Sequence, residues 1–179
     1  MLNTEEAVLV MVDFQGRLVE IVHRKALVVP NAIRLVKGCQ ALGVPALSTL
    51  QVPEKLGPMP PELAEALGDT APIPKVVFSA LREPDFLLAL RQSGRTQAIL
   101  TGIEAHVCVM QTGLDLLDAG YMVHALSDGM FSRTAENHDL ALKRLHDAGA
   151  TISSVEMALF ELIRTSVHPQ FRTISGLIK

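Results

Sequence analysis

The chain has 179 residues, of which 49% are apolar, and a formal net charge of −3. This length predicts a single domain, residues 1–179, with a full hydrophobic core. The sequence has no basic patch and only 4% aromatic residues, and both features argue against nucleic-acid binding. No apolar run approaches the roughly 18–20 residues of a membrane span, and the N-terminus lacks signal-peptide features, so we expect a cytoplasmic protein with no membrane partner.

The first third of the chain alternates strand and helix patterns. AVLVMVD (7–13) is a continuous apolar run that ends in an acid, which is typical of a strand buried on both faces. Residues 29–43 have apolar positions at roughly helical spacing and stop at Gly43, and VPALSTL (44–50) predicts the second strand. The Pro/Gly-rich stretch 51–63 is too irregular for an element of its own, and loops of this length are usually lids, binding loops or subunit contacts.

The middle of the chain continues the alternation. Pro72 and Pro74 are two residues apart, so both would remove donors from the same side of a strand, which fits only an edge strand. Pro84 opens a helix that stops at Gly94, since proline is tolerated in the first helical turn. QAILTGI (97–103) predicts a third buried strand, followed by a helix over 107–119.

The last third supplies a strand at 121–128, an amphipathic helix at 134–149, a strand at 150–156 and a helix at 157–165. Alternation of this kind implies right-handed crossovers and a parallel sheet covered on both faces. The expected fold is α/β, a three-layer α/β/α sandwich around a six-stranded, mostly parallel, Rossmann-like sheet.

Three polar residues are predicted to follow strands at the edge of the sheet where ligands bind. They are Asp13, Lys75 and Cys108. Cys108 would lie in the first turn of a helix, where free N–H groups and a nearby Lys75 ammonium are expected to lower the thiol pKa. Asp13 could accept the thiol proton and later return it.

Each of these residues also has an ordinary structural explanation. Cys108 could be a small buried hydrophobe, Asp13 a helix cap or turn former, and Lys75 a solvated surface side chain. His106 offers a Cys–His dyad, although side chains two residues apart across a strand–helix turn tend to diverge. Cys39 lies among apolar neighbours in a helical pattern and is expected in the core. With no CxxC pair, a disulfide scaffold and a structural zinc site are not expected.

The motifs VDFQ (12–15), KVVFSAL (75–81) and GIEAHVCVMQTGLDLLDAGY (102–121), with SDGMFSR (127–133) and LKRLHDAGA (142–150), resemble the isochorismatase-like cysteine hydrolase family. The resemblance covers nearly the whole chain in the right order. The closest likeness is to the metal-free, oligomeric members of that family.

The resemblance implies an Asp–Lys–Cys catalytic triad of Asp13, Lys75 and Cys108. It also implies a non-proline cis peptide between Ile103 and Glu104, which would turn the Glu104 and Cys108 amides into an oxyanion hole. The substrate pocket is expected to be lined by the 51–63 loop and by four side chains, namely Phe14, Gln15, Phe78 and Leu81.

One departure from the family concerns metal binding. The nicotinamidase branch has an Asp-x-His pattern after the second strand, whereas TLQVPEKLGPMPPE (49–62) contains neither His nor Asp. None of the six histidines supplies a ligand pair there. We therefore expect no catalytic metal and no cofactor, and nicotinamide is not the expected substrate.

The leading hypothesis is a cysteine hydrolase that acts on a small amide-like substrate. Isochorismatase-type vinyl-ether hydrolysis with Asp13 as the acid is an alternative, as are a redox-active thiol and a non-catalytic interaction protein. The high apolar content exceeds what one core hides, which predicts a homo-oligomer.

Overall fold

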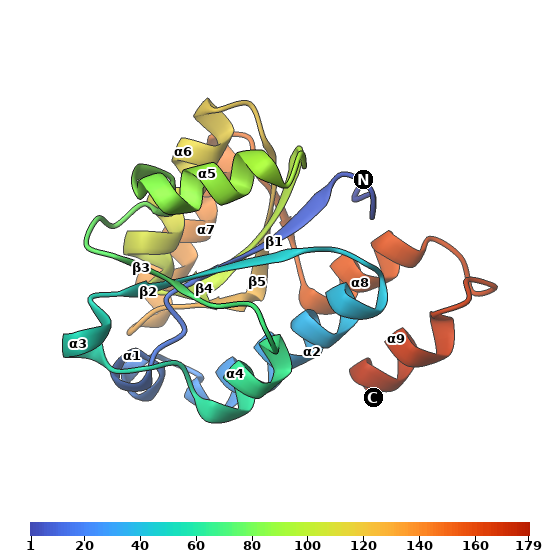
Figure 1. The fold of residues 1–179 in the computed structure, drawn as a ribbon, viewed down its shortest axis with the longest axis horizontal. Helices are drawn as coiled ribbons and strands as arrows, with labels where there is room; N and C mark the ends of the chain where they lie inside the picture. Colours follow the sequence, from blue (N-terminus) through green and yellow to red (C-terminus); the bar gives the residue numbers. More distant parts are fainter.

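A six-stranded, wholly parallel sheet separates two helical layers in the computed structural model, which describes residues 1–179 (Figure 1). The strand order β3-β2-β1-β4-β5-β6 reverses between β1 and β4. The strands are β1 (Ala7–Val12), β2 (Ala46–Gln51), β3 (Ile73–Lys75), β4 (Gln97–Ile103), β5 (Met122–Phe131) and β6 (Thr151–Ser153). The expected α/β class is confirmed, and the reversal is where ligands bind in such sheets.

Helices cover both faces of the sheet (Figure 1). One layer holds α1 (Gly16–Ile21), α2 (Lys25–Ala41), α4 (Pro61–Leu67), α8 (Val155–Ile163) and α9 (Phe171–Ile178), with α3 (Pro53–Leu56) beside α1. The other holds α5 (Pro84–Gln92), α6 (Met110–Asp118) and α7 (Ala135–Asp147), with the short turns η1 (Ala80–Arg82) and η2 (Ala105–Val109). Successive side chains of a strand point to opposite faces of the sheet. Along β1, Leu9 and Met11 therefore pack against the layer that contains α2 and α8, while Val8 and Val10 pack against the layer that contains α5, α6 and α7.

Several sequence-based boundaries hold. β4 spans the predicted residues 97–103, and β3 is an edge strand in which Pro74 pairs with Leu50. Cys39 is buried in the core, where burial raises the pKa of its thiol to about 12.

Other boundaries were wrong. The 51–63 stretch contains α3 and the start of α4, because each helix begins at a proline, which supplies a helical φ where no N–H is needed. β5 extends to Phe131 because it carries extra residues opposite Thr101, where the register with β4 shifts. The helices α1 and α9 were not expected.

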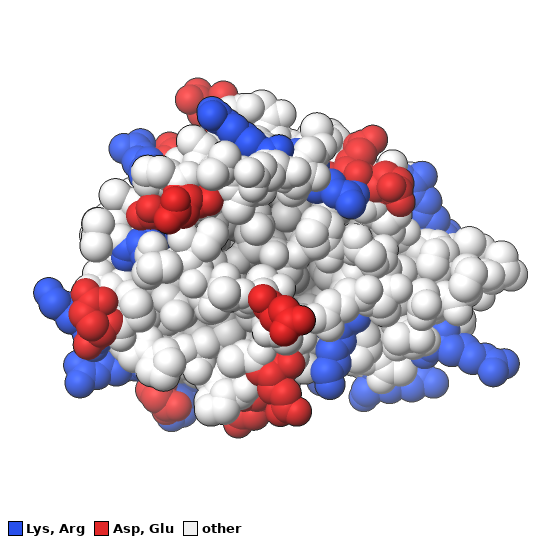
Figure 2. Space-filling view, in the orientation of Figure 1, with Lys and Arg blue, Asp and Glu red and all other residues white.

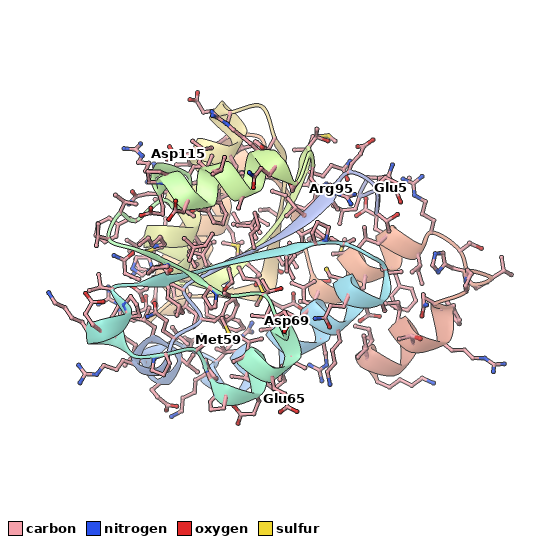
Figure 3. All side chains as sticks on the ribbon, viewed as in Figure 1. Glu5, Met59, Glu65, Asp69, Arg95 and Asp115 are labelled. Atoms are coloured by element: carbon pink, nitrogen blue, oxygen red, sulfur yellow. The ribbon has the colours of Figure 1, made fainter.

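Charged side chains lie on the outer sides of both layers. Basic and acidic groups are interspersed around the face seen in Figure 2, whose centre is mostly uncharged. Asp115 on α6 and Glu65 on α4 mark the outer sides of the two layers (Figure 3). None of the helices has both the length and the apolar run that crossing a membrane requires.

Gly102, near the end of β4, permits the close approach of β1. Its φ is +154°, and a Cβ there would meet the Val12 carbonyl oxygen, with Val12 Cβ at 2.8 Å and Val109 Cγ2 at 2.9 Å. A side chain would therefore push β1 away from the turn that follows β4.

We predict that Gly102→Ala lowers the free energy of unfolding by about 1–3 kcal/mol, through overpacking and an unfavourable backbone conformation. Gly176→Ala is the matched control, because its Cβ would meet nothing within 4 Å and alanine favours a helix by up to about 1 kcal/mol. Urea unfolding measures both variants. Equal stability of Gly102→Ala and the native protein would contradict the packing described here.

Candidate active site

The structure brings Asp13, Lys75 and Cys108 together at the carboxyl ends of β1, β3 and β4. Lys75 Nζ lies 2.7 Å from Asp13 Oδ2, and neither side chain has exposed surface. Cys108 is 5% exposed. The pKa of its thiol responds to both partners: Asp13 raises it, and Lys75 lowers it. The three residues proposed from sequence therefore form one cluster.

Asp13 is held by the backbone at the end of β1. Its φ is +57°, a left-handed conformation that turns the chain out of the strand. Its amide N donates to the Thr49 carbonyl at 3.1 Å, and the Thr49 hydroxyl donates to Asp13 Oδ1 at 2.8 Å. One carboxylate oxygen is thus bound by Thr49 and the other by Lys75, so Asp13 is more than a turn former.

Lys75 is not a solvated lysine. Besides Asp13, its ammonium contacts Gln51 Oε1 at 2.6 Å and the carbonyls of Val77 and Phe78 at 3.2 and 3.0 Å. A buried ammonium needs such partners, since desolvating an unpaired charge is costly. β3 delivers Lys75 to this position because it pairs with β2, with Gln51 opposite Lys75.

Cys108 lies within η2, ahead of the regular helix α6 that begins at Met110. Helical structure thus begins at Ala105, two residues before the predicted start at Val107, and its first turn is π-helical. The Thr112 hydroxyl donates to the Cys108 carbonyl at 2.7 Å and accepts from the Ala80 amide at 3.0 Å. These two bonds connect η2, the turn that carries Cys108 and is called the cysteine turn below, to the segment that follows β3.

The expected cis peptide between Ile103 and Glu104 is absent, since no peptide bond of the chain is cis. The chain reverses instead through a left-handed Glu104, with φ +58° and ψ +58°. Its carbonyl accepts from the Val107 amide at 2.8 Å. Rotation about the backbone dihedrals of one residue makes the turn, so a cis bond is not needed.

The predicted lowering of the Cys108 pKa was also wrong. Burial raises the pKa of the thiol to about 12, the Asp13 carboxylate raises it further, and Lys75 opposes both. The desolvation of a thiolate outweighs one nearby cation here, because that cation is already neutralised by Asp13. At neutral pH the sulfur therefore carries its proton.

His106 does not form a dyad with Cys108. Its Nδ1 lies 3.1 Å from Ser132 Oγ, and its Nε2 lies 3.6 Å from Glu104 Oε2. Glu104 also contacts Arg133 Nε at 3.3 Å, while its Oε1 is buried without a hydrogen-bond partner. The contacts of His106 are thus with Ser132 and Glu104.

The four residues expected around the substrate differ in exposure. Phe14 has no exposed surface and packs in the core, because the turn at Asp13 directs it into the layer of α2 and α8. Gln15 is buried and joins loops, accepting from Gln51 N at 2.6 Å and donating to the Gly57 carbonyl at 3.0 Å. Leu81 is nearly buried, whereas Phe78 is half exposed. Of the four, only Phe78 presents substantial surface.

Gln51 and Thr49 were missed from sequence. Gln51 Oε1 accepts from Lys75 and lies 4.0 Å from Cys108 Sγ, so it touches two of the three cluster residues. Both side chains leave the end of β2 on one face, between β1 and β3. Because Thr49 and Gln51 are two residues apart, the sequence does indicate that their side chains share one face of the strand. Assigning them to the site also requires knowing that β2 lies between β1 and β3. No three His, Cys, Asp or Glu side chains converge closely enough to hold a metal ion.

Comparison with known proteins gives consistent matches. The model of the isochorismatase domain matches residues 7–157. The secreted isochorismatase effector Isc1 of Phytophthora sojae is 37% identical over an alignment of 177 residues, and the match covers 97% of this chain and 84% of the relative.

Two solved structures share the fold closely. The MAR1 ribonuclease from Caenorhabditis elegans has a TM-score of 0.92 and 32% identity, with 99% of this chain and 91% of that one covered. YcaC from Pseudomonas aeruginosa, solved with hexane-2,5-diol and covalent acrylamide, has a TM-score of 0.93 and 25% identity, covering 98% and 90%.

The opposing effects of Asp13 and Lys75 on the Cys108 pKa give a prediction. Below its pKa, the thiolate fraction changes about tenfold per pKa unit, and a nearby charge typically shifts a pKa by about 1–3 units. At a fixed pH of about 9, Asp13→Asn should alkylate about tenfold faster or more, and Lys75→Met correspondingly slower. Iodoacetamide labelling of Cys108, read by peptide mass spectrometry, measures both rates.

A Cys39→Ala background confines the labelling to Cys108. Circular dichroism establishes that each variant is folded at the temperature used. If neither substitution moves the rate, the charges of Asp13 and Lys75 do not act on the sulfur, and the cluster is not a functional unit.

Proposed function

The chain belongs to the isochorismatase family and is thereby a hydrolase of the isochorismatase-like superfamily; from that premise we propose that it hydrolyses a small amide-like substrate through a thioester on Cys108. Asp13 is the base and acid of the proposal, and Lys75 holds the Asp13 carboxylate. The observation that carries it is one buried sulfur whose pKa responds to a buried, ion-paired carboxylate, with Gln51 Oε1 lying 4.0 Å from the sulfur and 2.6 Å from Lys75 Nζ.

The protonated thiol requires a base, and Asp13 fits that role. As Cys108 Sγ attacks the substrate carbonyl carbon, its proton passes to Asp13 and the carbonyl electron pair moves to oxygen. The C–N bond then breaks, and the leaving nitrogen takes the proton from Asp13. The products of this half-reaction are an amine and a thioester, and Asp13 is a carboxylate again.

The second half-reaction regenerates the sulfur. Water adds to the thioester carbonyl and gives a proton to Asp13; the C–S bond then breaks, and Cys108 recovers its proton. Lys75 and Thr49 each bind one oxygen of Asp13 throughout. They therefore orient the carboxylate without taking part in bond exchange.

The developing oxyanion needs fixed donors. We assign this role to the backbone amides of Glu104 and Cys108, on the trans, left-handed turn instead of a cis peptide. Donors that are fixed before reaction stabilise charge without reorganisation, and one such donor is typically worth about 3–4 kcal/mol.

The YcaC neighbour supports a nucleophile in this fold. It is described with covalent acrylamide, and acrylamide is an electrophile that adds to thiols. The same reagent is a reasonable probe of Cys108 in this chain.

The alternatives fit the geometry less well. A redox-active thiol needs an accessible thiolate, whereas the Cys108 pKa is raised to about 12 and its surface is nearly closed. Vinyl-ether hydrolysis with Asp13 as the acid would not need the sulfur. Although the C. elegans neighbour is named a ribonuclease, an RNA backbone requires free cations, and Lys75 is already paired with Asp13.

Two inferences from the sequence remain predictions, the homo-oligomer and the cytoplasmic location. Val76 and Phe78, beside Lys75, are 75% and 53% exposed. We propose that a second copy covers these side chains and closes the substrate pocket.

We predict that Cys108→Ala abolishes hydrolysis across a panel of small amides, ureides and carbamates, while Cys39→Ala, the matched control, retains it. Mass spectrometry of the native protein quenched during turnover should find an acyl adduct on Cys108. Activity of Cys108→Ala near the native rate would favour the acid-only mechanism, and a sulfenic acid without an acyl adduct would favour redox chemistry.

A further inference from the structure

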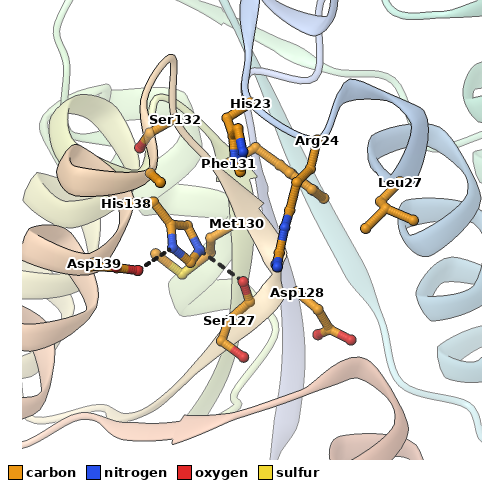
Figure 4. A pocket seen from close by; sticks show the side chains of 11 residues that line it. His23, Arg24, Leu27, Ser127, Asp128, Met130, Phe131, Ser132, His138 and Asp139 are labelled. Carbon is orange, nitrogen blue, oxygen red and sulfur yellow. Dashed lines mark hydrogen bonds and ion pairs between the residues drawn. The ribbon is translucent and has the colours of Figure 1, made fainter.

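One cavity of the molecule is not lined by Asp13, Lys75 or Cys108. It lies between the α1–α2 connection, the end of β5 and the first turns of α7 (Figure 4), and has a volume of about 160 Å³. The extra residues of β5 opposite Thr101 form one wall, which includes Ser127 and Asp128. The backbone N of His23 donates to the Ser132 carbonyl at 2.8 Å and ties two of the walls together.

Arg24 is the cation of this cavity. Its backbone is left-handed, with φ +63°, immediately before α2. Figure 4 shows its side chain running into the cavity between Leu27 and Met130, with its tip toward Asp128. Its guanidinium makes no ion pair or side-chain hydrogen bond. An unpaired guanidinium presents a planar fork of donors that matches a carboxylate.

The remaining polar groups of the cavity are mostly occupied. His138 Nε2 lies 2.8 Å from the Ser127 carbonyl and Nδ1 lies 3.1 Å from Asp139 Oδ1. Asp128 Oδ1 accepts from the Val155 amide at 2.8 Å. Of the lysines and arginines, only Arg24 lines the cavity, and its guanidinium is free to bind an anionic ligand.

Size and lining restrict that ligand further. The volume is close to the roughly 150 Å³ that accommodates benzene in an engineered cavity. Leu27, Met130 and Phe131 supply apolar contact, while Asp128 and Asp139 would repel a second negative charge.

We propose that this cavity is a second small-molecule site, which binds a monocarboxylate with an apolar body about the size of a benzene ring. Arg24 binds the carboxylate, and Leu27 with Met130 packs against the body. The site is separate from the triad, but the two share a wall, because Ser132 lines the cavity and its hydroxyl contacts His106 in the cysteine turn.

Benzoate tests the proposal, with benzyl alcohol as its uncharged counterpart, by isothermal titration calorimetry. We expect saturable benzoate binding to the native protein with a dissociation constant of about 1 mM or tighter, and much weaker binding of benzyl alcohol. Arg24→Gln should weaken benzoate about tenfold or more, since it removes a charge-assisted interaction.

Lys25→Gln is the matched control. Lys25 is the adjacent cation, is exposed, pairs with Glu20 at 3.1 Å and does not line the cavity, so its loss should change benzoate affinity less than about twofold. Leu27→Asp, which adds a negative charge at the cavity, should weaken benzoate as well and serves if Arg24→Gln proves unstable. No saturable binding, an undiminished affinity in Arg24→Gln, or an equal loss in Lys25→Gln would each overturn the proposal.

Discussion

Lys75 and Asp13 form an ion pair 2.7 Å long in which neither side chain has exposed surface, and the rest of the site is arranged around it. Two charges taken out of water are tolerated only if their remaining donors and acceptors are satisfied. The sheet order meets this requirement, since β2 lies between β1 and β3 and contributes Thr49 to the carboxylate and Gln51 to the ammonium. The ion pair thus depends on the carboxyl ends of β1, β2 and β3 lying at the same edge of the sheet.

Burial and the ion pair together set the state of the sulfur. Because the Lys75 charge is largely balanced by Asp13, burial dominates and Cys108 remains a thiol. A neutral resting thiol suits a mechanism in which the base acts only when substrate is present, and it protects the sulfur from oxidation. The strand reversal between β1 and β4 places Asp13 beside the cysteine turn. Asp13 and Cys108 therefore lie at the position where ligands bind in sheets of this class.

Apolar periodicity predicted the sheet, and strand-end position predicted Asp13, Lys75 and Cys108, because both signals are local in sequence. Gln51 and Thr49 were missed because their roles depend on which strands are neighbours. The sign of the Cys108 pKa shift depends on burial, which sequence does not provide. The turn at Glu104 was expected from family resemblance as a cis peptide, whereas the backbone reaches the same reversal through a left-handed residue. The cavity around Arg24 arises from extra residues in β5 that no periodic pattern indicates.

A thermodynamic double-mutant cycle on Asp13 and Lys75 tests the central claim most directly. Asp13→Asn, Lys75→Met and the double variant are compared with the native protein by urea unfolding. Each single substitution leaves an unpaired buried charge and should cost about 3–5 kcal/mol, while the double variant should cost less than the sum by about 2 kcal/mol or more. Additive costs, within about 0.5 kcal/mol, would show that the two residues are not coupled and would contradict the account.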